Sequence, residues 1–83
     1  MKYLICEDFS GQPVPFIFPD KVAHLDMRDQ LPYGKVISAG YIAFESGRFV
    51  CSGGDVELGA SALPGDANCI TAFFAEPRGG GEA

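Results

Sequence analysis

Residues 35–45 read KVISAGYIAFE, and this stretch decides the fold. Apolar side chains occupy both parities of the run, so a strand formed here has both faces covered and lies inside a sheet. Gly40, in its middle, marks either a bulge or a place where another group packs closely. Ser46-Gly47 then predicts a tight turn, and residues 48–52 the returning strand. The centre of the fold is therefore expected to be an antiparallel hairpin.

Two further strands are predicted before this hairpin. Residues 3–6 are a short run of strand-forming residues, and residues 14–18 follow a turn at 10–13. Pro15 and Pro19 lack the N–H that a sheet ladder needs, which favours an edge position for the second strand. The two runs are expected to pair as an antiparallel hairpin.

A helix is predicted between the two hairpins. Asp20 is expected to cap it, and Ala23, Met27 and Leu31 recur at a spacing of four and form its buried stripe. Pro32 is expected to end it.

The stretch after the second hairpin is less regular. Gly53-Gly54 interrupts the strand, and residues 55–58 are expected to resume the alternation with Val56 and Leu58 pointing inward. Residues 66–75 fit a helix capped by Asp66 and also fit a strand. The helix is preferred, and the strand stays open as an alternative.

The expected fold is α+β: a small, mostly antiparallel sheet in the order β-β-α-β-β-α, with the helices on one side. A single domain is expected over residues 1–77, followed by a flexible glycine-rich tail at 78–83. Helices on one side leave the other face of the sheet uncovered. This predicts a homodimer, with interface candidates Tyr41, Ile42 and Phe16.

Charge and cysteine content narrow the classes of function. Eleven acidic and six basic residues give a net charge of −5, which disfavours direct binding to nucleic acid or to an anionic membrane. The apolar run near the N-terminus is too short for a signal peptide or a membrane span. Cys6, Cys51 and Cys69 form no C-x-x-C pair, and His24 is the only histidine. We therefore expect reduced thiols in a cytoplasmic protein, with no metal site and no cofactor.

The segment that most resembles a catalytic site is Cys51-Ser52-Gly53-Gly54-Asp55. A nucleophile elbow needs a strand-to-helix turn, whereas this segment continues into strand-like residues, so a β-bulge is the preferred interpretation. His24 is a candidate general base, although a structural hydrogen bond is the commoner role of a lone histidine. An anion could be held by backbone amides of Gly53, Gly54 and Gly65 together with Arg48 or Lys35.

Several short segments resemble small proteins encoded by phages and prophages. The matching segments are Phe18-Pro19-Asp20 with Ala23-His24, Val36 to Tyr41, Cys51-Ser52-Gly53 with Leu58-Gly59, and Pro64-Gly65-Asp66-Ala67. The resemblance implies a helix after residue 65 and a phage or prophage setting, and it supplies no catalytic residues.

The sequence favours a non-enzymatic interaction protein, homodimeric and phage-encoded, that binds a host or phage protein. The alternative is a binding protein that sequesters a small ligand or nucleotide. A cysteine-dependent enzyme ranks last.

Overall fold

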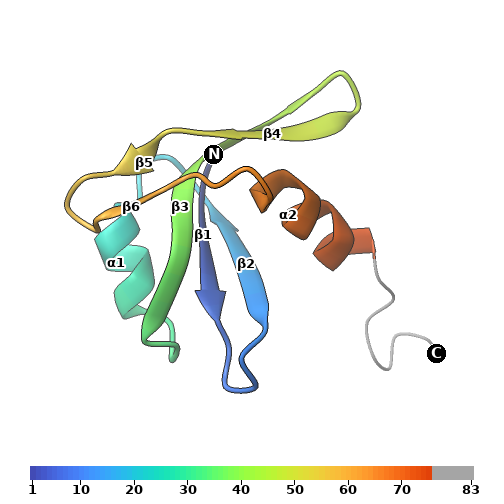
Figure 1. Cartoon of the computed structure of the whole chain (residues 1–83). Coiled ribbons are helices and arrows are strands. Elements are labelled where there is room, and N and C mark those ends of the chain that lie inside the picture. Colours follow the sequence, from blue (N-terminus) through green and yellow to red (C-terminus); the bar gives the residue numbers. More distant parts are fainter. Residues whose placement is uncertain (76–83) are drawn as a thin grey trace.

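The computed structural model of the chain describes residues 1–75, in which an antiparallel sheet is flanked by two helices (Figure 1). The four strands lie side by side in the order β2-β1-β3-β4. They span Lys2–Glu7 (β1), Pro13–Phe18 (β2), Lys35–Glu45 (β3) and Arg48–Ser52 (β4). Both predicted hairpins are present, and β2 is an edge strand as its prolines indicate. The predicted tail at 78–83 lies outside the described residues.

The element order differs from the predicted one, because a second sheet of two short strands follows β4. It pairs β5 (Gly54–Asp55) with β6 (Ala60–Ser61). The chain turns sharply between them: the backbone N–H of Gly59 bonds back to the carbonyls of Asp55 and Val56. The prediction that residues 55–58 alternate as a strand is therefore wrong. Val56 is 97% exposed rather than inward, whereas Leu58 packs against the core.

The helices lie on opposite faces of the sheet, which corrects the expectation that both lie on one side (Figure 1). Helix α2 (Asp66–Ala75) packs through Ile70 on the face that carries Tyr3 and Ile5. Helix α1 (His24–Asp29) covers the face that carries Leu4 and Cys6. Successive side chains of a strand point to opposite faces, so a strand that is apolar at every position needs a cover on both. Strand β1 has this property from Tyr3 to Cys6, and two small cores result.

Helix α2 confirms the helical interpretation of residues 66–75. Helix α1 is shorter than predicted, because residues 19–22 form a turn in which the N–H of Val22 bonds to the carbonyl of Pro19. Ala23 is its N-cap residue and makes no side-chain cap bond. Asp20 pairs instead with the terminal ammonium of Met1 at 3.0 Å, so its predicted role as a cap is wrong.

Strand β3 has different partners along its length. Strand β1 pairs with it as far as Tyr41, and β4 pairs with it only from Tyr41 onward. Residues 41–52 therefore form a two-stranded hairpin that projects beyond the end of β1 (Figure 1). We call this segment the hairpin arm. Gly40 lies at its base, and a Cβ there would meet the carbonyl oxygen of Ser52 at 2.5 Å, so the close-packing interpretation of this glycine holds.

Candidate functional site

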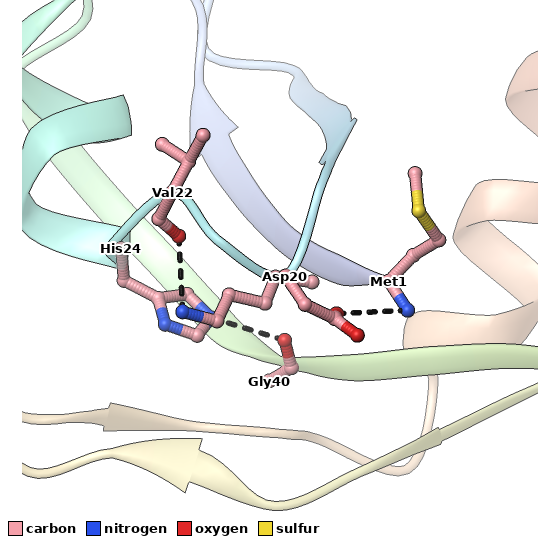
Figure 2. Close-up of polar contacts among 6 residues, drawn as sticks. Met1, Asp20, Val22, His24 and Gly40 are labelled. Carbon is pink, nitrogen blue, oxygen red and sulfur yellow. Dashed lines mark hydrogen bonds and ion pairs between the residues drawn. The ribbon is translucent and has the colours of Figure 1, made fainter.

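His24 is a structural hydrogen bonder in this fold. It is buried, and its Nε2 lies 3.0 Å from the carbonyl oxygen of Gly40 (Figure 2). A carbonyl only accepts, so Nε2 carries the proton in this bond. Phe18 and Tyr41 contact the imidazole edge-on, with ring centroids 5.4 Å and 5.8 Å away. His24 thereby ties the start of α1 to β3.

The cysteines are placed and perturbed unlike catalytic thiols. Burial raises the pKa of Cys6, Cys51 and Cys69, whereas a nucleophilic cysteine needs a lowered pKa. Cys51 and Cys69 pack on the α2 side of the sheet, and His24 lies on the α1 side. The sheet therefore separates these two thiols from the only imidazole. The segment from Cys51 to Asp55 is the end of β4 followed by β5. A nucleophile elbow requires a helix directly after the strand, whereas the next element here is β6.

The residues proposed for an anion site are dispersed. Arg48 is at the tip of the hairpin arm, whereas Lys35 is at the other end of β3 and pairs with Glu7 at 3.5 Å. The carbonyl of Gly53 accepts a bond from Ala62, and Gly54 is within β5.

The remaining glycine of that set, Gly65, precedes α2, and its carbonyl accepts the N–H of Cys69. The buried carboxylate of Asp66 already occupies this helix start. An anion placed here would meet a carboxylate, so the structure does not assemble these residues into one anion site.

A buried polar network is present that the sequence patterns do not predict. Asp66 is only 4% exposed, and its carboxylate accepts hydrogen bonds from the hydroxyls of Tyr3 (2.5 Å) and Ser38 (2.9 Å) and from the backbone N–H of Leu63 (2.9 Å). Burial and the bond to Asp66 raise the pKa of Tyr3 above its usual range. The network joins α2 to the two central strands. Its three side chains are shielded from solvent.

The hairpin arm carries exposed apolar side chains on both of its sides. Three cross-strand pairs lie on the side of the arm that faces away from α2, and all six residues are exposed. We call this side the outer face; its residues are Tyr41, Ala43, Glu45, Arg48, Val50 and Ser52. Tyr41 and Val50 remain 45% and 39% exposed, and Phe44 on the opposite side of the arm is 65% exposed. A two-stranded hairpin with apolar residues on both sides is marginally stable alone, so this arm gains from being covered.

A hollow of about 270 Å³ opens on the outer face. Tyr41, Val50 and Ser52 line it, together with the carboxylate-bearing residues Asp20 and Glu45. Figure 2 shows Asp20 next to the base of the arm, bonded to the terminal ammonium of Met1. Met1 also lines the hollow, which therefore combines apolar side chains with two carboxylates and one ammonium group.

Within the described part of the chain, the backbone of β4 is unpaired along the edge of the sheet, on the side away from β3. The turn at Ser46 and Gly47 has positive φ at both residues (52° and 80°), which is the type I′ geometry of a two-residue hairpin. In such a hairpin the closing pair, here Glu45 and Arg48, exchanges hydrogen bonds, and the bonds to the partner strand then alternate along the chain. The N–H and C=O groups of Phe49 and Cys51 consequently point away from β3. Within residues 1–75 they bond to no other element.

The opposite edge of the sheet, strand β2, has fewer backbone N–H donors because it contains two prolines. Pro13 and Pro15 of β2 pair with Glu7 and Ile5 of β1. Proline has no N–H to donate, so these two positions offer a further strand no donors. Strand β4 carries no proline and has one charged residue, Arg48, so its edge offers a further strand the donors that the β2 edge lacks at residues 13 and 15.

The interface candidates from the sequence are not gathered on one surface. Tyr41 lies on the outer face, whereas Ile42, at 5% exposed, belongs to the core beneath α2. Phe16 lies in the edge strand β2 and packs against Tyr33. Val50 and Ala43 are absent from those candidates, although the alternation of residues 41–52 around the Ser46-Gly47 turn places them on the same side as Tyr41.

No protein-family model, curated protein or solved structure matches this chain. Within residues 1–75, no helix is long and apolar enough to cross a bilayer.

Proposed function

We propose that the protein is a non-enzymatic interaction protein and that it binds another protein through the hairpin arm. The observation that carries this proposal is the outer face of the arm, where exposed Tyr41 and Val50 adjoin the open edge of β4. Partner proteins commonly add a strand at a sheet edge where unpaired backbone groups lie beside an exposed apolar surface. The arm supplies both features in one place.

The placement of the titratable groups supports a non-enzymatic role. His24 is engaged with a backbone carbonyl, and the three thiols have raised pKa values. The network around Asp66 is shielded from solvent. None of these groups faces the hollow on the outer face.

The setting of the protein is part of the same proposal. A host or phage protein is the expected partner class, on the strength of the resemblance to phage and prophage proteins. The three free cysteines fit a reducing cytoplasm. A net charge of −5 argues against nucleic acid and anionic membranes as partners.

Site-specific photocrosslinking tests the proposal for a protein partner of any identity. A photoreactive amino acid replaces Val50 on the arm, and in a matched protein it replaces Val56 in the β5–β6 turn, where the side chain is 97% exposed. Irradiation in host cells should give a covalent protein adduct from position 50 and none from position 56. Mass spectrometry then identifies the adduct. No adduct from position 50, or equal adducts from both positions, would overturn the proposal.

A further inference from the structure

The protein partner that best fits the open edge of β4 is a second copy of the chain. A sheet with two open edges assembles into open-ended filaments, whereas a sheet with one open edge closes after a single pairing. Pro13 and Pro15 remove donors from the β2 edge, which leaves β4 as the edge better suited to accept a strand. A symmetric dimer is the closed assembly that this asymmetry permits.

We infer that two copies pair antiparallel through β4, with the two-fold axis at Val50, an inference that rests on the proposed binding role of the arm. Only this register pairs all five residues of the strand. Phe49 of each copy then lies opposite Cys51 of the other, and these are the residues whose N–H and C=O groups point outward. The two valines at position 50 meet on the axis. The result is one continuous sheet across both copies.

Charge supports the same register. Within residues 1–75, Arg48 has no ion-pair partner. In the dimer it lies opposite the partner's Ser52, which lines the hollow together with Asp20 and Glu45. The guanidinium of each copy is thus directed to a hollow of the other in which the two carboxylates outnumber the single ammonium group of Met1. This pairing offsets the general repulsion between two acidic chains.

The area buried between the two copies has to include side chains of the outer face as well as the paired backbone. A stable dimer buries on the order of 1,200 Å² in total, which five paired residues on each side do not provide by backbone contact alone. The outer-face residues of β4, namely Arg48, Val50 and Ser52, lie beside the partner's β4, so their side chains are covered together with the edge, whereas Tyr41 and Ala43 lie on β3, one strand further from the partner. Pairing and burial therefore act on the same surface.

Sedimentation equilibrium tests the inference. The unmodified protein at high micromolar concentration should have twice the 8.8 kDa mass of one chain. Val50→Lys puts two like charges on the axis and should raise the dissociation constant at least about tenfold, whereas the matched change Val56→Lys should leave it unaltered. Both side chains are solvent-facing, and circular dichroism verifies that each variant is folded.

A charge exchange tests the register itself. Arg48→Glu and Ser52→Lys should each weaken the dimer, because the first places a carboxylate at the acidic hollow and the second places a lysine opposite Arg48 of the other copy. The double variant R48E/S52K should restore it, since residues 48 and 52 lie opposite each other only across the dimer axis.

A monomeric unmodified protein, an unaffected Val50→Lys dimer, or no restoration in the double variant would each overturn the inference. A photocrosslink from position 50 to a foreign protein, together with a monomer in sedimentation, would overturn the dimer alone and leave the binding role of the arm intact.

Discussion

Removing one hydroxyl, in Tyr3→Phe, should destabilise the protein by about 2 kcal/mol. The phenol is fully buried and donates to the carboxylate of Asp66 at 2.5 Å. A hydrogen bond to a carboxylate contributes roughly 1.5–3 kcal/mol, and no water replaces the lost donor in a closed site. The ring is retained, so no large cavity forms and the change isolates the polar term. For a domain of this size, the expected fall in Tm is on the order of 10 °C.

Urea unfolding of the two proteins measures this difference, and Tyr33→Phe is the matched control. Tyr33 packs through its ring against Phe9 and Phe16, and its hydroxyl makes no hydrogen bond within residues 1–75. The control should therefore stay within about 0.5 kcal/mol of the unmodified protein. A Tyr3→Phe protein as stable as the control would refute the view that the network around Asp66 holds α2 on the sheet.

Three further predictions follow from burial and pKa shifts. Ile42→Glu should unfold the protein, because this side chain is in the core, whereas Tyr41→Glu on the exposed side of the same strand should leave it folded; circular dichroism separates the two. Gly40→Ala should lower the free energy of unfolding by about 1–3 kcal/mol, since a methyl group there meets a backbone carbonyl, and a neutral result in urea would contradict the packing described. The raised pKa of Tyr3 favours folding fully below the ordinary tyrosine pKa of about 10 and loses this contribution as the pH rises above that value. Denaturation midpoints should therefore fall at alkaline pH, and by less in Tyr3→Phe; equal slopes in the two proteins would argue against this source.

The hairpins and α2 could be predicted because their signals are local. Ser46-Gly47 sets the turn of the arm, and the prolines of residues 13–19 mark an edge strand. Residues 66–75 carry a helical stripe directly after Pro64-Gly65. These features depend on neighbours in the sequence, and the structure confirms them.

The placement of the helices depends on contacts that no local pattern reveals. Residues 3–6 are apolar at every position, and in the structure they are covered on both faces of the sheet. A run this short also fits a strand with only one covered face, so the pattern alone does not place the helices. Residues 36–44 are apolar at nearly every position in the same way. The bond between Tyr3 and Asp66 joins residues 63 positions apart, so the local pattern predicts only a cap from an aspartate before a helix. The same local pattern predicts a cap from Asp20, although its partner is the chain's own amino terminus.

Amide hydrogen exchange, followed residue by residue by NMR, tests most directly whether the edge of β4 is a binding edge. In an isolated chain the N–H groups of Phe49 and Cys51 point to solvent, whereas that of Val50 bonds to β3. At high micromolar concentration, slow exchange is predicted at all three residues, with protection at Phe49 and Cys51 lost on dilution and in Val50→Lys. Fast exchange at Phe49 and Cys51 at every concentration, with Val50 protected, would contradict pairing between two copies.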